Sequence, residues 1–444
     1  MKPHQSPKRR LGNHAAASTS NSRDNEGAPP SDTLLARFLR YVQMDTQSDD
    51  SSVTCPSTPG QMALQEMLRA ELVAMGAADV RLTQYGYLMA TLPATSKRMR
   101  IPTVALLAHV DTAPDCLGRK VVPIVHRNYA GGVIRFPDNR RLSLDPVHDP
   151  ALLKAKGKDI VTASGATLLG ADDKAGVAVI MTLADHLLHH PELEHGVIRL
   201  CFTPDEEIGR GVNRLDLKEL KADFAYTLDG SGLGEISWET FSADAATVTI
   251  EGVSIHPGEA KAKGMVNAAH LAARLLTSLP REHCAPETTA DREGFIHPTH
   301  IEGGVKETVI HFILRDFELS GLAQKRAILQ ALCRGLQAAE PRARITLRIR
   351  KQYRNMAYWL RENMTPVEVA REAIRAMGMS PTESPVRGGT DGSRLTERGL
   401  PTPNLFCGEH NAHGPLEWVA VQDMELAVQT CVRLVELWAR RKSE

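Results

Sequence analysis

The sequence lacks two features that would place it in a specialised class of protein. Lysine plus arginine number 53 of the 444 residues, and aspartate plus glutamate also number 53. No excess of charge therefore indicates nucleic acid or an anionic membrane surface as a partner. No run approaches the roughly 18 consecutive apolar residues that a membrane span requires. We expect neither nucleic acid nor a membrane among the partners.

A disulfide framework is also missing from the pattern. The seven cysteines are odd in number, lie far apart and form no Cys-x-x-Cys pair: Cys55, Cys116, Cys201, Cys284, Cys333, Cys407 and Cys431. This usage fits buried thiols in a reducing compartment better than oxidised pairs. It predicts a cytoplasmic protein.

The remaining composition is that of an ordinary globular protein. Apolar residues make up 42% and charged residues 24% of the chain, whose length predicts two or three domains. Residues 1–32 differ, because they are rich in Ser, Asn, Pro and basic residues and lack an apolar segment long enough for a secretory signal. We expect a disordered tail there. A targeting signal at Lys8-Arg9-Arg10 is the less favoured interpretation.

Residues 33–240 alternate short apolar runs with helical periods. Residues 104–108 are continuously apolar, as expected of a strand that is buried on both faces. Residues 34–42, 61–75 and 175–188 have helical spacing. Strands that alternate with helices predict an α/β domain around a largely parallel sheet.

Residues 241–354 have a different pattern of apolar residues from residues 33–240. Strand patterns at 245–250, 295–301, 308–314 and 344–349 are interleaved with helical periods at 266–279 and 322–336. The order β-α-β-β-α-β is that of a ferredoxin-like module. Because this module stands in the middle of the chain, we expect an inserted α+β domain, with the first domain resuming over residues 355–444.

Metal-competent residues follow the apolar runs. They are His109, Asp111, Asp172, Glu206, Glu207, Asp229 and His413. Taken singly, Asp172 could cap a helix, His109 could be a core histidine, Asp229 could start a turn, and Glu206-Glu207 could be a solvated acidic loop. In open α/β sheets, however, ligands bind beyond the carboxyl ends of the strands. The recurrence of such residues at strand ends therefore predicts one shared site.

The residue types indicate a pair of transition-metal ions. Imidazole and carboxylate ligands suit zinc, cobalt or manganese better than calcium. His109 and Asp111 are two residues apart, so in a strand they project to the same side and Asp111 can hydrogen-bond the second ring nitrogen of His109. Glu206 and Glu207 are adjacent, so one can ligate while the other faces the substrate. Three ligating carboxylates and a hydroxide are neutralised by two divalent ions, which favours a two-metal site.

Six sequence blocks together resemble the peptidase T family, a group of tripeptide aminopeptidases in the dizinc exopeptidase and deacylase superfamily. The resemblance begins at about Leu34 and extends to the C-terminus. The blocks are His109-Val110-Asp111-Thr112, Leu169-Gly170-Ala171-Asp172-Asp173-Lys174-Ala175-Gly176, Thr203-Pro204-Asp205-Glu206-Glu207-Ile208-Gly209, Thr227-Leu228-Asp229-Gly230, Arg387-Gly388-Gly389-Thr390-Asp391-Gly392 and His410-Asn411-Ala412-His413-Gly414. The second and third are shared with the wider superfamily. The last two, with Pro56-Ser57-Thr58, indicate the peptidase T family itself.

The resemblance implies a mixed-sheet catalytic domain that binds two zinc ions, with cobalt or manganese as alternatives. Asp172 would bridge the ions. His109 and Asp229 would complete one metal site, and Glu207 and His413 the other. Two residues would then take catalytic roles, with Asp111 orienting His109 and Glu206 acting as the general base.

The inserted module would be a lid and a dimerisation domain. Its His256 would reach the active site of the partner in a homodimer. Asn267, Arg315 and Arg387 match positions associated with substrate binding, although a surface salt bridge is an alternative role for Arg315. The implied function is release of the N-terminal residue from short peptides, most often tripeptides.

Two departures from the family pattern stand beside His413. Ala412 replaces the usual Phe, and Trp418 replaces the usual Phe or Tyr, without loss of a ligand. Two other functions stay open: a deacylase or dipeptidase with the same metals, and a metal-binding dimer without catalysis. The non-catalytic protein would be expected to have lost Glu206 or a ligand, and all of these residues are present.

Overall fold

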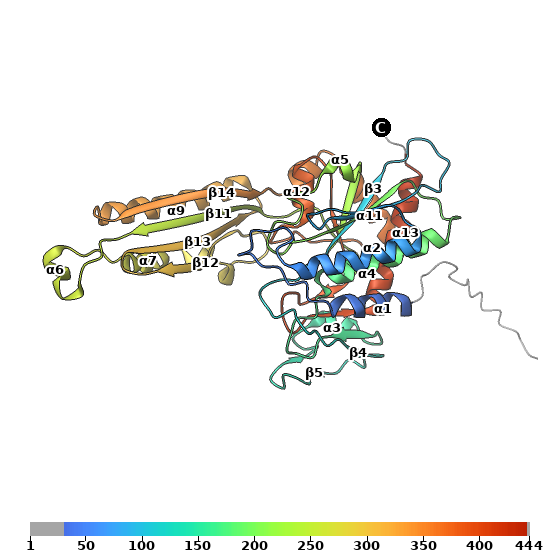
Figure 1. Ribbon diagram of the computed structural model, residues 1–444, viewed down its shortest axis with the longest axis horizontal. Coiled ribbons are helices and arrows are strands. Elements are labelled where there is room, and N and C mark those ends of the chain that lie inside the picture. The colour runs from blue at the N-terminus through green and yellow to red at the C-terminus, as the bar shows by residue number, and fades with distance from the viewer. Residues whose placement is uncertain (1–30, 442–444) are drawn as a thin grey trace, which may run out of the picture.

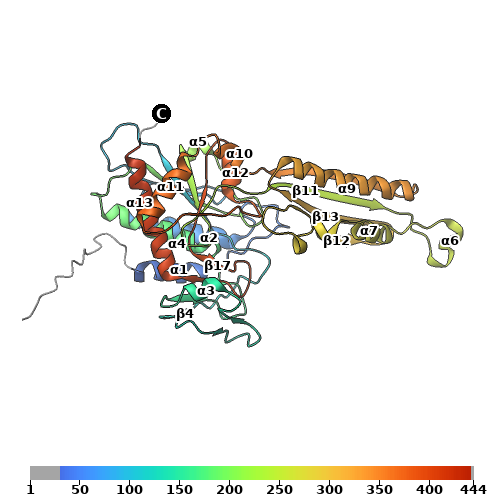
Figure 2. The same ribbon diagram turned by 180° about the vertical axis from the view of Figure 1, so that it is seen from behind.

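The computed structural model describes residues 31–441. Residues 1–30 of the tail predicted over residues 1–32 lie outside the described part of the chain. Helix α1 begins at Ser31. Two connected bodies are visible in Figure 1: a larger one that contains the main sheet, and an elongated module that projects from it. Figure 2 shows the same arrangement from behind.

The larger body is built on an eight-stranded mixed sheet. Its strands, in spatial order, are β1 (Ala78–Leu82), β2 (Leu88–Leu92), β8 (Ile198–Thr203), β3 (Val104–His109), β9 (Phe224–Leu228), β16 (Asn404–Leu405), β10 (Glu235–Ser237) and β15 (Thr382–Glu383). The central strands β8, β3, β9 and β16 run parallel. Antiparallel pairing joins β1 to β2, β2 to β8 and β16 to β10.

Strand β3 shows why its sequence is continuously apolar. Val104, Leu106 and Ala108 belong to the large hydrophobic core on one face of the sheet. Ala105 and Leu107 belong to a smaller core on the other face. Because alternate side chains of a strand point to opposite faces, burial of both faces requires an apolar residue at every position.

Helices cover both faces of the main sheet. The large core packs against α1 (Ser31–Val42), α2 (Pro59–Met75), α4 (Ala171–His189), α11 (Thr365–Ala376) and α13 (Val421–Ala439). The smaller core packs against α5 (Leu217–Leu220) and α12 (Asp391–Glu397). Between Ser31 and residue 441, no helix is both long enough and apolar enough to cross a bilayer.

A small second sheet adjoins the larger body and was not predicted from the sequence. Its strands, in order, are β17 (Glu409–His410), β18 (Trp418–Ala420), β7 (Ile160–Thr162) and β4 (Ile124–His126). The hairpin β5 (Ile134–Arg135) and β6 (Ser143–Leu144) and helix α3 (Pro150–Lys154) lie beside it (Figure 1). Trp418, Phe136 and Ile160 are buried together in a core of their own.

The projecting module has the predicted ferredoxin-like order. Its sheet runs β12 (Phe295–Gly303), β13 (Glu307–Asp316), β11 (Ser242–Glu251), β14 (Arg344–Tyr353), and every pairing is antiparallel. Helices α7 (Ala268–Thr277) and α9 (Leu319–Ala339) pack on it around a separate core. Short turns of helix add to the predicted elements: η1 (Pro257–Glu259), α6 (Ala260–Lys263), α8 (Arg281–Cys284) and η2 (Pro286–Thr288). The α/β fold with a mixed sheet and an inserted ferredoxin-like module is confirmed.

Two chain segments join the module to the larger body, and Asn355 ties them together. Its side-chain oxygen accepts a hydrogen bond from the Thr240 N–H at 3.1 Å, and its own N–H donates to Ser242 Oγ at 3.0 Å. The chain then continues into α10 (Ala357–Leu360). These contacts support a division at 240/241 and 354/355, and we propose residues 33–240 with 355–444 and residues 241–354 as the two domains.

Candidate metal centre

The five predicted metal ligands meet at the carboxyl ends of the parallel strands. His109 is the last residue of β3, and Asp229 directly follows β9. Glu207 lies in the loop after β8, and Asp172 lies at the start of α4. His413 comes from the loop between β17 and β18 and has a φ of 64°. The main sheet and the loop between β17 and β18 therefore bring together residues as far apart in the chain as His109 and His413.

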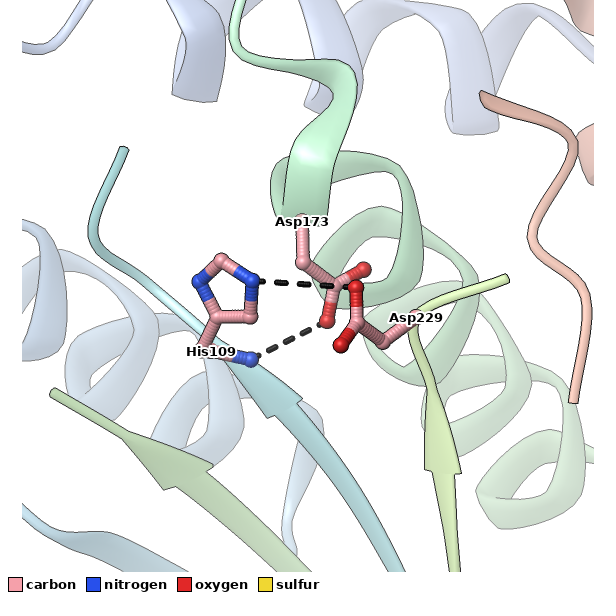
Figure 3. A group of neighbouring side chains, drawn as sticks. All are labelled: His109, Asp173 and Asp229. Carbon is pink, nitrogen blue, oxygen red and sulfur yellow. Dashed lines mark hydrogen bonds and ion pairs between the residues drawn. The ribbon is translucent and has the colours of Figure 1, made fainter. Parts of the chain in front are cut away.

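His109 and two aspartates form one half of the cluster. The Nε2 atom of His109 lies 2.9 Å from Asp172 Oδ1 and 3.7 Å from Asp229 Oδ1. Figure 3 shows His109 and Asp229 pointing toward each other, with Asp173 beside them. The backbone N–H of His109 donates to Asp173 Oδ2 at 3.0 Å, so the end of β3 is fixed to the start of α4.

His413 and Glu207 form the other half. The Nε2 atom of His413 lies 2.9 Å from Glu207 Oε2 and 3.2 Å from Asp172 Oδ2. Each carboxylate oxygen of Asp172 thus faces a different imidazole. This places Asp172 between the two halves, the position of the bridging ligand that the family resemblance implies, and the metal bridge itself stays a prediction.

The donor set fits divalent metal ions. Ligand atoms of His109, Asp172 and Glu207 all lie within 4.8 Å of one another, and so do those of Asp172, Asp229 and Glu409. Glu207 Oε1 is buried and has no hydrogen-bond partner. Since burying a carboxylate oxygen without a partner is costly, a cation at this position would stabilise the arrangement.

The electrostatics of the cluster lead to the same conclusion. Burial and the neighbouring Asp172 raise the pKa of Glu207 to about 8, and burial raises the pKa of Asp229 to about 6. Burial alone would raise the pKa of Asp172. Hydrogen bonds from the two imidazoles outweigh this effect and hold the pKa below its ordinary value. Hydrogen bonds to Asp172 and Glu207 raise the pKa of His413 to about 11. Without a metal, protons must supply the positive charge that this group of acids requires.

Asp111 connects the cluster to the Glu206-Glu207 pair. Its Oδ1 atom lies 3.3 Å from His109 Nδ1, and its backbone carbonyl oxygen lies 3.1 Å from the same ring nitrogen. The two carboxylate oxygens of Asp111 also accept hydrogen bonds from the backbone N–H groups of Glu206 and Glu207, at 3.0 and 3.2 Å. Burial, followed by the nearby Asp391, raises the pKa of Glu206 well above its ordinary value. The structure therefore brings Asp111 and Glu206 to the cluster.

Glu417 is a supporting residue that was not predicted from the sequence. It is 1% exposed, and its Oε2 atom accepts hydrogen bonds from the N–H groups of Leu169 and Gly170, both at 2.7 Å. Its Oε1 atom accepts a third from the Asp172 N–H at 3.0 Å. One carboxylate thus fixes the backbone that presents Asp172.

Asp205 is a second supporting residue that the sequence did not single out. Its carboxylate accepts hydrogen bonds from the Ser57 N–H at 2.9 Å, from Ser57 Oγ at 2.5 Å and from Gln61 Nε2 at 2.8 Å. Gln61 Oε1 in turn accepts from the Asp205 N–H at 3.0 Å. The Pro56-Ser57-Thr58 block therefore anchors the loop that carries Glu206.

Comparison with known proteins identifies the family. The family model described as peptidase family M20/M25/M40 matches residues 167–437. Peptidase T of Bacillus subtilis is 45% identical over 403 residues, which cover 91% of this chain and 98% of the relative. The chain belongs to peptidase family M20/M25/M40, in its peptidase T branch. Peptidase T of Listeria monocytogenes is 41% identical over 92% of this chain and 99% of its own.

Solved structures of two peptidases share the fold. A tripeptidase from Staphylococcus aureus aligns with a TM-score of 0.73 at 21% identity, covering 94% of this chain and all of the other. An M20 peptidase from Bacillus subtilis, described as dinuclear metal binding, aligns with a TM-score of 0.61 at 14% identity, covering 91% of this chain and 97% of the other.

Two residues expected to bind substrate in this M20 member lie away from the cluster of the same chain. His256 is exposed and directly precedes η1 and α6, and α6 lies at the end of the module farthest from the main sheet (Figure 1). The Asn267 side chain accepts a hydrogen bond from the Ala269 N–H at 2.9 Å and caps α7. The contact of His256 with the active site of a second copy stays a prediction, and so does substrate binding by Asn267.

The two predicted substrate-binding arginines have intramolecular partners. Arg387 donates to the carbonyl oxygens of Asp291 at 2.9 Å and Glu293 at 2.7 Å, and its guanidinium lies over the Phe241 ring. Arg315 Nη1 donates to Gln352 Oε1 at 2.8 Å, and within residues 31–441 Arg315 forms no salt bridge. Their substrate contacts stay predictions, and the partners of Arg387 favour a structural role for that side chain.

The loop that carries His413 is fixed through Trp418, one of the two departures from the family pattern. The indole Nε1–H of Trp418 donates to Asp149 Oδ2 at 2.9 Å, and Asn411 Nδ2 donates to the same oxygen at 2.9 Å. The His410 ring stacks on Trp418 with a centroid distance of 4.1 Å. A phenylalanine at position 418 could keep the stacking but not the hydrogen bond to Asp149.

The buried stack predicts a pH dependence of stability. Burial lowers the pKa of His410 to about 4 from an ordinary 6.5. Between these pH values the unfolded chain binds a proton that the folded chain does not, so this residue lowers the free energy of unfolding as the pH falls through that window. In His410→Phe, which keeps an aromatic ring, up to one proton fewer should be taken up on unfolding. Urea unfolding of both proteins between pH 4 and 7, after chelation of metals, measures the free energy of unfolding at each pH. The same pH dependence in the two proteins would contradict the prediction.

Proposed function

We propose that this chain is a metal-dependent aminopeptidase that releases the N-terminal residue of short peptides, most often tripeptides. The observation that carries the proposal is the position of Asp172 between the imidazoles of His109 and His413. A further buried acid, Glu206, interacts electrostatically with His109 and Asp229 of the same cluster. Relatives named peptidase T, 41–45% identical over about 92% of the chain, support the substrate class.

Asp172 is the proposed bridging ligand. We assign His109 and Asp229 to one ion and Glu207 and His413 to the other, with zinc as the metal that suits mixed nitrogen and oxygen donors. Bound there, two divalent ions would supply an acidified water and polarise the scissile carbonyl. Asp111 orients His109 by facing its Nδ1 atom at 3.3 Å.

Glu206 is the proposed general base. Its carboxylate removes the proton of the attacking water and delivers it to the leaving amine. Without bound cations the pKa of Glu206 lies well above its ordinary value, and two divalent ions beside it would lower this pKa, so that the carboxylate could accept a proton and release it again. Asp111 positions Glu206 and Glu207 together, because both backbone N–H groups donate to its carboxylate.

The enzyme is proposed to act as a cytoplasmic homodimer. His256 lies in the distal part of the module, so it would enter the active site of a second copy and donate to the developing oxyanion. A donor of this kind contributes about 3 kcal/mol to transition-state stabilisation. Asn267, Arg315 and Arg387 remain proposed substrate contacts.

A peptide panel tests the function. A free tripeptide should be cleaved at its first peptide bond, while the N-acetylated tripeptide should not, because an aminopeptidase recognises the free amine. The measurement is product release by mass spectrometry together with metal content before and after chelation. Preference for the acetylated peptide would indicate the deacylase, and preference for a dipeptide would indicate the dipeptidase. A dimeric protein with both metals and no turnover would indicate the non-catalytic alternative.

Mixing two inactive variants tests the contribution of His256 from a second copy. Glu206→Gln lacks the base, and His256→Ala lacks the oxyanion donor. In a mixed dimer, the site with an intact Glu206 receives His256 from the other subunit. Random re-pairing should restore about a quarter of wild-type activity, because half of the dimers are mixed and each has one complete site. No recovery despite mixed dimers seen by native mass spectrometry would contradict the assignment, and His270→Ala, on the exposed face of α7, is the control.

A further inference from the structure

A cationic cleft lies where the inserted module meets the loop that follows Glu207. Its volume is about 680 Å³. Five cationic side chains line it, namely Arg210, Arg214, Arg350, Lys351 and Arg394. Among the described residues that line the cleft there is no aspartate or glutamate. The cleft therefore concentrates positive charge in a protein whose formal net charge is zero.

Most of this charge is not neutralised within residues 31–441. Lys351 alone has a carboxylate partner, Glu397. Arg210 donates to the carbonyl oxygens of Asp50 and Ser52, both at 2.6 Å, and carbonyl oxygens orient a guanidinium without cancelling its charge.

The other three arginines form no ion pair in the described chain, although the buried Asp391 interacts electrostatically with Arg394. Arg394 Nη1 donates to Asn213 Oδ1 at 3.1 Å, and Arg214 lies 4.7 Å over the Tyr85 ring. The Arg350 side chain is exposed and forms neither a hydrogen bond nor an ion pair with residues 31–441, while its backbone pairs with Ala245 of β11. Guanidinium groups held in this way keep donors available for an incoming ligand.

The cleft adjoins the metal cluster but shares no ligand with it. Ile208 and Gly209 form part of its wall and directly follow Glu206-Glu207 in the chain. Gly209 has a φ of 66°, and a Cβ atom there would lie 3.3 Å from Arg394 Nη2. The backbone conformation and the close guanidinium both favour glycine at this position. Residues 52–55, Asn213 and Arg394 of α12 add to this wall from the larger body, and residues 350–352 of β14 add to it from the module, so the cleft joins the two.

We propose that this cleft is a binding site for a multiply charged oxyanion, either a carboxylate-bearing peptide segment or a free phosphate. Guanidinium forks pair with carboxylate and phosphate oxygens through two parallel hydrogen bonds. A cleft of this size with several uncompensated cations suits a ligand with more than one charge. If the anion belongs to a peptide, the inference rests on the proposed function. If it is free phosphate, the inference stands without it.

The test uses the metal-loaded enzyme and the double variant Arg214→Gln/Arg350→Gln. Both side chains are exposed and outside the proposed catalytic machinery, so the fold should be retained, as a melting curve will verify. The matched control is Arg348→Gln, an exposed arginine two residues earlier on β14 that does not line the cleft. Inorganic phosphate binding is measured by calorimetry. KM and kcat are measured for tripeptides with Asp or Asn as the third residue.

The two arms separate the sources of the anion. With a free anion as ligand, the double variant should bind phosphate at least about tenfold more weakly than wild type, while the control is unchanged. With a peptide as ligand, the double variant should raise KM for the Asp peptide about tenfold, with little change in kcat or in KM for the Asn peptide. Unchanged phosphate affinity and unchanged KM would overturn the proposal. The calorimetric arm needs no turnover, so its failure is distinct from failure of the peptidase assignment.

Discussion

Glu206→Gln should lower kcat by about 10²–10⁴-fold while leaving both metal ions bound. The amide is nearly isosteric with the carboxylate but cannot accept the proton of the attacking water. Its backbone N–H still donates to Asp111, so the loop should keep its conformation. Steady-state kinetics and metal analysis by mass spectrometry on the same preparation measure the two effects.

The neighbouring residue provides the sharpest comparison. Glu207→Gln should lose metal as well as activity, because Glu207 Oε2 lies 2.9 Å from His413 and belongs to the proposed ligand set. Glu66→Gln, an exposed change on α2, controls for the loss of one carboxylate. Wild-type turnover in Glu206→Gln with full metal content would remove Glu206 from the mechanism.

Glu417→Ala should destabilise the protein and weaken metal binding together. The substitution leaves the N–H groups of Leu169, Gly170 and Asp172 without their acceptor in a buried position. Hydrogen bonds to charged groups contribute about 1.5–3 kcal/mol each and do not add fully, so we expect a loss of about 3 kcal/mol or more. Because residues that orient metal ligands typically change affinity by 10–100-fold, we expect a drop of that size.

A second substitution separates the two effects. Glu417→Gln keeps one acceptor oxygen for Leu169 and Gly170 but presents an amide N–H₂ toward the Asp172 N–H. Stability measured by urea unfolding of the metal-free protein should fall less than in the alanine variant. Affinity measured by metal titration should still fall. Wild-type metal affinity in both variants would show that metal binding by Asp172 does not depend on the hydrogen bonds to Glu417.

The sequence predicted the parts of the site that combine a local pattern with a distinctive side chain. The run at 104–108 indicated a doubly buried strand, and His109 follows it directly. Glu206 and Glu207 were recognisable from the apolar run that precedes them. Strand ends are informative because the parallel sheet brings them to one edge, whatever their separation along the chain.

Other features could not be read from local patterns. Glu417 accepts hydrogen bonds from backbone N–H groups about 245 residues away. Because every residue except proline has such an N–H group, these partners cannot be recognised from the sequence. Asp173 directly follows Asp172 in the sequence, yet its hydrogen bond from the His109 N–H depends on how β3 and α4 pack. The small second sheet consists of strands of two or three residues, which are too short to show periodicity.

Strand β16 lies between β9 and β10 in the main sheet, although it follows them by more than 160 residues. During synthesis, β9 and β10 therefore leave the ribosome with a gap between them that residues 404–405 fill much later. His413 and Glu417 emerge later still, so neither the sheet nor the metal cluster is complete on a partly synthesised chain. The order of the strands thus delays assembly of the hydrolytic site until residues 404–417 have been synthesised.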